Sequence, residues 1–137
     1  MKKLLLSLVL FIGVSLSVNA QNTSDFSGLL KTAVTMTNAQ VDSTVVAISG
    51  SRSAITFNVQ LTKVSGTTAG SIVLMYKTTN RADEAWITHT TTALTDQAGT
   101  KGYDFKLVNN PGVRYKLLLT TSGTSVNTYR PFAVYRK

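Results

Sequence analysis

The residue types best suited to acid–base chemistry are scarce in this chain, which has one histidine and six acidic residues among 137. The histidine, His89, lies in the segment Ile87-Thr88-His89-Thr90, and threonines on both sides are typical of a solvated position near the end of a strand. A hydrolytic triad would need His89 beside both a nucleophile and a carboxylate. The sequence has no Gly-x-Ser-x-Gly elbow that would mark such a nucleophile. We therefore expect no catalytic residues, that is, a protein that is not an enzyme.

The residue types and their spacing also provide little support for a metal or cofactor site. The acidic residues are Asp25, Asp42, Asp83, Glu84, Asp96 and Asp104, and their spacing singles out neither a glycosidase pair nor the ligand ladder of an EF-hand. Because cysteine is absent and histidine occurs once, a thiolate zinc site and a multi-histidine metal cage are excluded. The glycine-containing stretch 66–70 lacks the Lys-Ser/Thr of a phosphate-binding loop. The sequence predicts no metal and no cofactor.

Positive charge is concentrated toward the end of the chain, whose formal net charge is +8. From residue 101 onward, Asp104 is the one acid against Lys101, Lys106, Arg114, Lys116, Arg130, Arg136 and Lys137. We interpret these charges as guards that keep exposed strand edges from pairing with other chains. The alternative is a basic face for an anionic glycan, a lipid headgroup or an acidic protein surface. No nucleic-acid partner is expected, because no RNA-binding aromatic motif, helix-turn-helix pattern or zinc knuckle occurs.

The first residues have the order of a secretory signal peptide. Lys2 and Lys3 form a basic region, an apolar run follows, and Val18-Asn19-Ala20 supplies small residues before a cleavage site. The apolar run is shorter than the ~20 residues that a spanning helix needs. We expect residues 1–20 to be a signal peptide and residues 21–137 to form one domain without a membrane span. The protein would then be secreted, periplasmic or attached to the cell surface.

Alternation of apolar and polar residues predicts strands in the remaining sequence. It is clear over residues 55–61, 72–76, 103–107, 113–119 and 132–134, and weaker over 34–36 and 45–48. Threonine clusters such as residues 90–92 favour pleated, half-solvated strands over helices. About seven short strands predict an all-β fold, a single antiparallel two-sheet β-sandwich of the immunoglobulin or fibronectin type. A small closed barrel is the alternative.

The expected core and turns follow from the same pattern. The centre of the core is expected to hold the largest aromatic and aliphatic side chains: Phe57, Trp86, Phe105, Tyr115 and Leu117. Residues 65–70 are expected to form an extended hairpin loop, and residues 121–125 to close the last hairpin. Residues 80–84 and 96–102 are predicted to be further loops.

Residues 53–134 also resemble a known group of proteins. The segments that carry the resemblance are "QLTKVSGTTAGSIVLMYKTT", "EAWITHTT", "ALTDQAGTKGYDFKL" and "NPGVRYKLLLTTSGT". Their turns and aromatic positions are similar to those of small β-sandwich structural proteins encoded by tailed phages and related elements of Bacteroidetes. The resemblance implies an immunoglobulin- or fibronectin-like module that builds or decorates the surface of a particle, so that a virion is the alternative location.

These observations favour a non-enzymatic, exported structural or binding module. Its loops at 65–70, 80–84 and 96–102 would contact a protein surface or a second copy of the chain, with self-association through strand edges. The alternative is an extracellular carbohydrate-binding or adhesion domain, which predicts two or more aromatic side chains in one plane on one sheet face, drawn from Trp86, Tyr129 and Tyr135. The candidate contact residues are Arg81, Trp86, Tyr129, Arg130 and Tyr135.

Overall fold

A computed structural model describes residues 26–48, 54–109 and 112–136, so the proposed signal peptide lies outside the described residues. The described chain is all β. Its strands are β1 (Phe26–Leu29), β2 (Val34–Met36), β3 (Val41–Ala47), β4 (Ala54–Ser65), β5 (Thr68–Lys77), β6 (Ile87–Ala93), β7 (Thr100–Val108), β8 (Arg114–Gly123) and β9 (Val126–Arg136). None of the described residues forms a helix that is long and apolar enough to cross a membrane.

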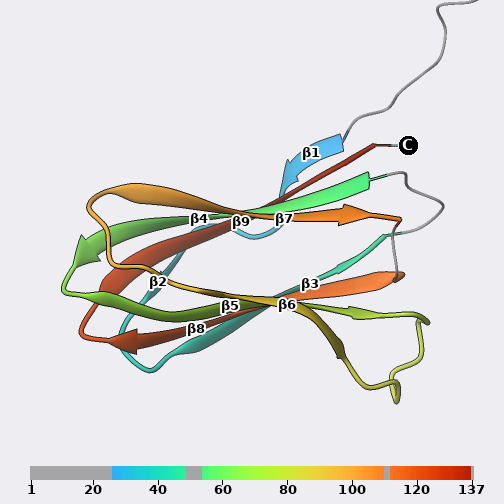
Figure 1. Cartoon of the computed structure of the whole chain (residues 1–137), viewed down its shortest axis with the longest axis horizontal. Helices are drawn as coiled ribbons and strands as arrows, with labels where there is room; N and C mark the ends of the chain where they lie inside the picture. Colours follow the sequence, from blue (N-terminus) through green and yellow to red (C-terminus); the bar gives the residue numbers. More distant parts are fainter. Residues whose placement is uncertain (1–25, 49–53, 110–111, 137) are drawn as a thin grey trace, which may run out of the picture.

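The strands form two antiparallel sheets packed face to face, which confirms the predicted sandwich (Figure 1). One sheet has the order β1-β9-β4-β7, with β2 also paired to β9, and we call it the β4 sheet. The other has the order β3-β8-β5-β6, and we call it the β8 sheet. The described residues contain nine strands where about seven were expected, because β1 and the threonine-rich β6 do not alternate between apolar and polar residues.

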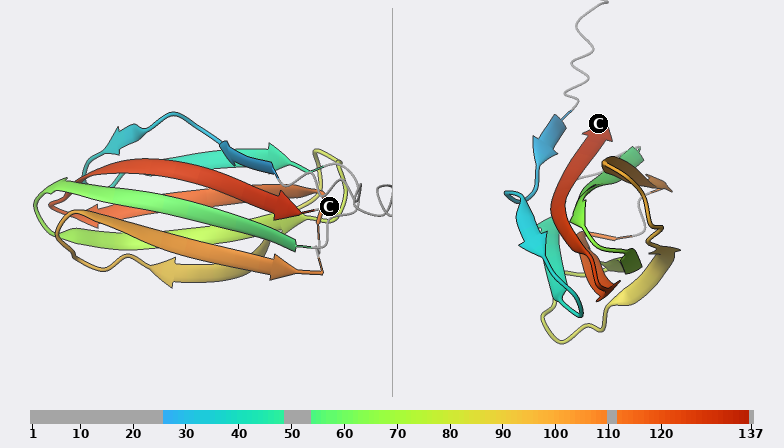
Figure 2. Two further views of the ribbon diagram at one scale, coloured as in Figure 1. Left: turned by 90° about the horizontal axis from the view of Figure 1, so that it is seen from above. Right: turned by 90° about the vertical axis from the view of Figure 1, so that its left-hand side faces the viewer.

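Consecutive strands mostly lie in different sheets, and β5–β6 is the one consecutive pair among the described strands that is hydrogen bonded together. The segment β4–β5 runs antiparallel to β8–β9 as a single ribbon that bends over one end of the sandwich (Figure 2). Its ladder passes from Ser65↔Val126 in one sheet to Thr68↔Gly123 in the other. This strand order is that of a jelly roll, whereas the sheets of an immunoglobulin domain have a different order.

Two predicted hairpins are therefore wrong. Residues 65–70 and 121–125 carry the chain from one sheet to the other, and neither β4–β5 nor β8–β9 is a hydrogen-bonded pair. We call the end where these passages lie, together with residues 37–40 and 94–99, the crossing end (Figure 1, left). The turn residues were recognised correctly, but the sheet that each following strand joins depends on distant residues.

Glycine is required where the two passages touch. Gly66 has φ +74° and Gly70 has φ +123°, values that favour glycine. A Cβ on Gly66 would overlap the carbonyl oxygen of Thr124, and one on Gly70 would overlap that of Thr120. The ribbon can therefore fold over only because these positions lack a side chain.

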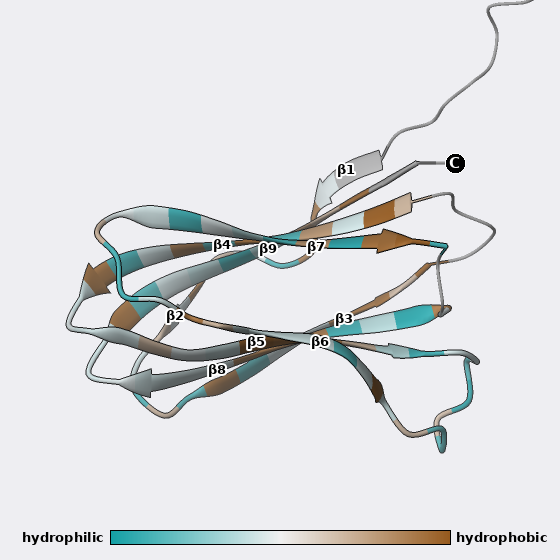
Figure 3. Cartoon of the chain, in the orientation of Figure 1, coloured by the Kyte–Doolittle hydropathy of each residue, from teal (hydrophilic) through white to brown (hydrophobic). Residues whose placement is uncertain are grey.

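Apolar side chains at alternate strand positions fill the space between the sheets. Figure 3 shows the corresponding alternation of hydrophobic and hydrophilic residues along the strands. The fully buried ones include Ile55, Phe57, Val59, Leu61, Ile72, Leu74, Tyr115, Leu119 and Tyr129. The rings of Phe57 and Tyr115 meet across the two sheets with centroids 5.3 Å apart. Four of the five residues expected at the centre of the core are buried, namely Phe57, Phe105, Tyr115 and Leu117. The fifth, Trp86, is not in the core and is described below.

The crossing end also buries polar groups, which are bonded to one another. The Thr68 hydroxyl donates to Asn127 Oδ1 at 3.0 Å, and Asn127 Nδ2 donates to the Ser125 hydroxyl at 2.7 Å. At the surface, the Asp96 carboxylate accepts from Lys63 Nζ at 2.7 Å and from the Thr68 backbone N–H at 2.8 Å. The Lys63 ammonium, with the Thr68 N–H, lowers the pKa of Asp96. These bonds fix the passages in place and give this end a structural role.

Candidate binding face

The loop between β5 and β6 is organised around one carboxylate. Glu84 Oε1 accepts from the backbone N–H and the hydroxyl of Thr78, at 2.8 and 2.7 Å. Glu84 Oε2 accepts from the same two groups of Thr79, at 2.9 and 2.6 Å. Hydrogen bonds from the threonine side chains and backbone lower the pKa of Glu84 to about 2, since they favour the ionised form. The carboxylate thus holds the start and the end of the loop together.

Hydrogen bonds from Lys77 connect the loop to the end of β5. Lys77 is only 4% exposed, and its Nζ donates to the backbone carbonyls of Ala82 at 3.0 Å and Arg81 at 3.3 Å. At the tip of the loop, the guanidinium of Arg81 binds Asp83 through Nε–Oδ1 at 3.0 Å and Nη2–Oδ2 at 2.7 Å. Glu84 and Asp83, the two acids of the loop, therefore both have partners nearby: threonines for Glu84 and Arg81 for Asp83. The Lys77 ammonium is bonded to backbone carbonyls of the same loop.

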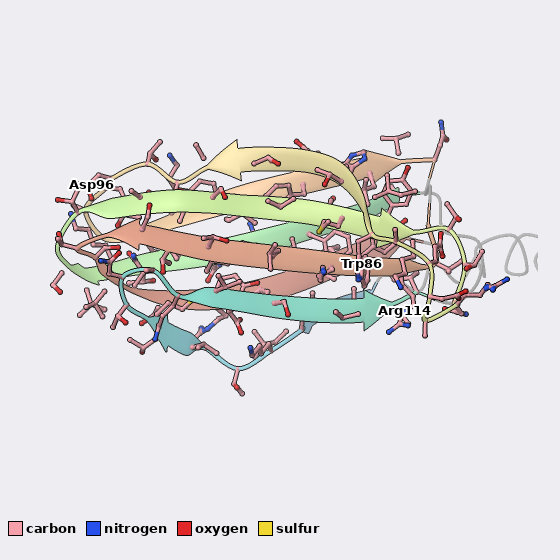
Figure 4. The ribbon with its side chains drawn as sticks, turned by 90° about the horizontal axis from the view of Figure 1, so that it is seen from below. Trp86, Asp96 and Arg114 are labelled. Atoms are coloured by element: carbon pink, nitrogen blue, oxygen red, sulfur yellow. The ribbon has the colours of Figure 1, made fainter. Side chains whose placement is uncertain are left out.

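Trp86, at the end of this loop, lies against the outer face of the β8 sheet, so its predicted place in the core is wrong. Its ring centroid is 5.1 Å from Lys77 Nζ and 4.7 Å from Lys116 Nζ. Lys77 and Lys116 share the outer face, because Lys77 pairs with Arg114 and the inward positions of β8 are the alternate ones, such as Tyr115. Figure 4, which views this face, places Trp86 over β8 at the same end as Arg114 and opposite to Asp96. The Trp86 side chain is half-buried.

We call Trp86, Lys77, Arg114 and Lys116 the Trp86 face. Attraction between an ammonium and an aromatic ring orients Trp86 and contributes about 0.5–2 kcal/mol per contact. Arg114 and Lys116 are half-exposed and pair with no acidic side chain among the described residues. The face therefore combines one fixed aromatic ring with two cationic groups that can bind an anion.

The predicted contact residues do not gather in one place. Arg81 is exposed in the β5–β6 loop, while Arg130 is exposed on β9 in the other sheet. Tyr129 is 0% exposed, so its predicted role in contacting a partner is wrong, and burial raises its pKa to about 12. The backbone of Tyr135 pairs with Phe26 in the β4 sheet, and its side chain lies outside the described part.

The predicted aromatic pair on one face is not found among the described side chains. Two aromatic side chains lie half-buried on outer faces, Trp86 on the β8 sheet and Phe132 on the β4 sheet, so the sandwich separates them. Tyr76 is also half-buried, but it packs against the core. A flat, multi-ring platform is therefore absent from residues 26–48, 54–109 and 112–136.

The three loops expected to contact one partner lie at opposite ends. Residues 65–70 and 96–102 meet at the crossing end through the bonds of Asp96 to Lys63 and Thr68. Residues 80–84 lie at the other end of β5, a strand of ten residues and so roughly 30 Å long. The prediction that all three loops contact one partner surface is therefore wrong.

His89 and the acids show no catalytic or metal arrangement in the described part of the chain. His89 is exposed, and its ring lies edge-on to Tyr76 with centroids 6.3 Å apart. No group of three or more His, Cys, Asp or Glu side chains that could hold a metal ion occurs in the ranges the structure describes.

Sequence reasoning missed Lys77, Arg114 and Lys116 as parts of one face. A usable signal exists for two of them, because Arg114 and Lys116 alternate with the apolar positions Val113, Tyr115 and Leu117 and so must point outward. The burial of Lys77 has no such signal, since it depends on how the following loop folds back. The prediction that these basic residues guard strand edges is also wrong for Arg114, Lys116 and Arg130, which lie on the central strands β8 and β9.

Comparisons with known proteins support the fold. No family model matches the chain, and no curated protein sequence matches it either. A solved structure described as "CBM4 structure and function" is similar with a TM-score of 0.53 and 8% sequence identity, over 88% of this chain and 83% of that chain. A "Family 16 Carbohydrate Binding Module-2" has a TM-score of 0.41 and 9% identity, over 71% of this chain and 70% of the other. The enzymatically active domain of bacteriophage CBA120 tailspike protein 4 has a TM-score of 0.44 and 10% identity, over 85% of this chain and 19% of the other. At these identities the likeness concerns the β-sandwich fold alone.

Proposed function

We propose that this chain is an exported, non-enzymatic binding domain whose Trp86 face recognises an acidic carbohydrate. The observation that carries the proposal is the position of the chain's one tryptophan outside the core. It is fixed by a hydrogen-bonded loop and lies beside Arg114 and Lys116, neither of which pairs with an acidic side chain in the described part of the chain. A tryptophan held at the surface by so many contacts is arranged to meet a ligand.

The aromatic ring accounts for recognition of a sugar ring. The indole presents a large apolar surface with a polar edge, and the C–H groups on one face of a pyranose can pack against such a ring. The loop between β5 and β6, which we call the Trp86 loop, is fixed by Glu84 and Lys77, so little side-chain freedom would be lost when a ligand binds. With no second aromatic on the same described face, the site fits one sugar unit rather than a long run of stacked units.

The cations account for the acidic character of the ligand. An arginine binds a carboxylate or a sulfate through two parallel hydrogen bonds, and a lysine supplies a compact charge beside it. Neither nearby acid forms an ion pair with these cations, because Glu84 accepts hydrogen bonds from Thr78 and Thr79 and Asp83 is paired with Arg81. A uronic acid or a sulfated sugar matches this combination of ring and charges.

The predicted signal peptide and the β-sandwich fold both agree with an extracellular sugar ligand, but the proposal does not test either of them. The predicted signal peptide would deliver the domain to extracellular glycans. The fold shared with a carbohydrate-binding module is compatible with a sugar ligand, but the proposal depends on the Trp86 face. The particle-surface role implied by the resemblance to phage proteins stays a prediction, and no feature of the described residues favours it over glycan binding.

Binding of the purified protein to immobilised polygalacturonate, a sulfated galactan, cellulose and xylan tests the proposal. We expect binding to at least one acidic polymer and little to the neutral ones. Trp86→Ala should weaken this binding at least about tenfold, which corresponds to about 1.4 kcal/mol. Phe132→Ala, the matched change on the other sheet, should leave it unaltered.

A second pair of variants distinguishes binding at a specific site from the general attraction of a basic protein to polyanions. Arg114→Gln and Arg130→Gln remove the same charge from opposite faces of the sandwich. Only Arg114→Gln should weaken binding at physiological salt, because long-range attraction is screened beyond about 8 Å. Equal losses in both variants, or full binding by Trp86→Ala, would contradict the proposal.

A further inference from the structure

The outer edges of the two sheets differ in charge. The β4 sheet ends on one side at β7, whose edge-facing positions include Asp104 and Lys106, and on the other side at the short strands β1 and β2. Charges and short or interrupted strands are the usual means by which a sheet edge is kept from pairing with another chain. The β4 sheet is therefore protected on both sides.

The β8 sheet ends at β3 and β6. On β6 a register shift at His89 interrupts the ladder with β5, but residues 90–93 pair regularly, and no charged side chain lies at the edge-facing positions of this part or of β3. Thr121 N donates to Gln40 O and Ile48 N donates to Val113 O, so the even-numbered residues of β3 bond to β8. The backbone groups of Val41, Ser43, Val45 and Ala47 consequently point away from the sheet. Similarly, Leu94 N donates to Gly70 O, so the backbone groups of Thr91 and Ala93 on β6 point away from β5.

Six of the residues with outward-pointing backbone groups are uncharged and exposed. They are Val41, Ser43, Val45, Ala47, Thr91 and Ala93, and Val41 and Val45 are 63% and 45% exposed. Each is small or β-branched, a type that fits readily between neighbouring strands. No described strand pairs with the outer side of β3 or of β6.

The strand directions determine how a second copy would fit. All pairs in the order β3-β8-β5-β6 are antiparallel, so β6 runs opposite to β3. A copy shifted sideways along the sheet, with the rotation that sheet twist requires, would present its β3 antiparallel to β6 of the first copy. Each of the two strands has seven residues, and residues 90–93 of β6, on one side of its register shift, form the regular part that would pair with β3.

We propose that this protein self-associates by pairing β6 of one copy with β3 of the next, which extends the β8 sheet from copy to copy. The contact is heterologous, because two different edges meet, so it repeats and forms rows of copies instead of a closed dimer. Backbone hydrogen bonds provide the attraction, as in other cases of strand addition. The proposal does not depend on a glycan, but a row of copies would carry several Trp86 faces and would bind a polymeric ligand with higher avidity.

Sedimentation velocity of the purified protein over a wide range of concentration tests this inference. We expect the average mass of the unmodified protein to rise steadily with concentration. Thr91→Lys on β6 and Val45→Lys on β3 should each remain monomeric, while Thr128→Lys, on the central strand β9 of the β4 sheet, should behave as the unmodified protein. If Thr91→Lys does not fold, Ala93→Lys tests the same edge, and far-ultraviolet circular dichroism checks each variant.

Mixing the two monomeric variants gives the sharpest result. Thr91→Lys keeps an intact β3 edge and Val45→Lys keeps an intact β6 edge, so an equal mixture should form dimers of one copy of each and nothing larger. A symmetric β6–β6 dimer would instead leave Val45→Lys able to dimerise alone and would give no mixed dimer. That result, or an unmodified protein that is monomeric at every concentration, would overturn the proposal.

Discussion

The two ends of the sandwich are built by different means. At the crossing end, the chain passes between sheets through glycines whose missing side chains leave room for the neighbouring backbone, and buried polar groups bond to each other. At the opposite end, which we call the Trp86 end, the β5–β6 loop is shaped by hydrogen bonds that Glu84 accepts and Lys77 donates. The loop ends in a half-buried tryptophan beside cations. One end is fixed by backbone sterics, the other by side chains on the surface.

This difference separates stability from recognition. Substitutions at the crossing end should change the free energy of unfolding, since both sheets depend on the same passages. Substitutions in the Trp86 loop should change binding and local order while the sheets remain folded, because the loop connects two strands that are already hydrogen bonded to each other. Strands of about ten residues keep the two ends roughly 30 Å apart.

The largest expected effect is on stability at the crossing end. Gly70→Ala places a methyl group against the Thr120 carbonyl at a φ of +123°, so it should lower the free energy of unfolding by about 3 kcal/mol or more. Gly99→Ala is the matched control, because Gly99 also has a positive φ, +72°, but a Cβ there would have no atom within 4 Å. It should cost only about 1–2 kcal/mol. Urea denaturation of both variants checks the difference, and equal losses would show that the close passage has no energetic importance.

A smaller effect with opposite signs is expected from two buried tyrosines. The Tyr115 hydroxyl, toward the Trp86 end, accepts from Gly112 N and donates to Gly112 O, both at 3.0 Å. The Tyr129 hydroxyl and the nearby Thr44 hydroxyl both lack a hydrogen bond of good geometry among the described residues. Tyr115→Phe should therefore destabilise the protein by about 1 kcal/mol, while Tyr129→Phe should be neutral or stabilising by a similar amount, since an unbonded buried hydroxyl is unfavourable.

The dependence of stability on alkaline pH tests the burial of Tyr129. Burial raises the pKa of Tyr129 to about 12, so the folded state keeps the phenolic proton after the unfolded chain, with a pKa near 10, has lost it. The stabilising contribution is fully present below pH 10 and is lost as pH rises toward 12. Tyr129→Phe should reduce this alkaline loss, measured by denaturation at several pH values. An unchanged profile would indicate that the Tyr129 hydroxyl reaches solvent.

Much of the sandwich could be predicted from the sequence, because burial with a period of two is a local pattern. The positions of β4, β7 and β8 and the burial of Phe57, Phe105 and Tyr115 follow from alternation alone. The passage between sheets could not be predicted in this way. Whether Ser65 is followed by a hairpin or a crossing depends on contacts such as that of Gly66 with Thr124, which is distant in sequence.

The candidate site was less accessible to prediction. A single large aromatic such as Trp86 is usually assigned to the core because burying it is favourable. Here the loop contacts of Glu84 and the ammonium of Lys77 hold it outside, and neither could be inferred from residue types alone. The outward direction of Arg114 and Lys116, in contrast, was contained in the alternation of β8.

The smallest effect on overall stability, and the most local one, is expected at Glu84. Hydrogen bonds from Thr78 and Thr79 lower its pKa to about 2, so the order that they give the loop is fully present above the ordinary pKa of 4.5 and is lost as pH falls toward 2. Trp86 is the one tryptophan, and its fluorescence should report this transition at a pH where far-ultraviolet circular dichroism still shows folded sheets. Glu84→Gln should lack the transition and should show the altered Trp86 emission already at neutral pH, because an amide NH₂ cannot accept from the Thr79 N–H and hydroxyl. A wild-type transition centred near pH 4.5, or one that survives in Glu84→Gln, would mean that the carboxylate does not hold the loop. The contrast between one end built by side chains and the other built by the backbone would then be contradicted at its most specific contact.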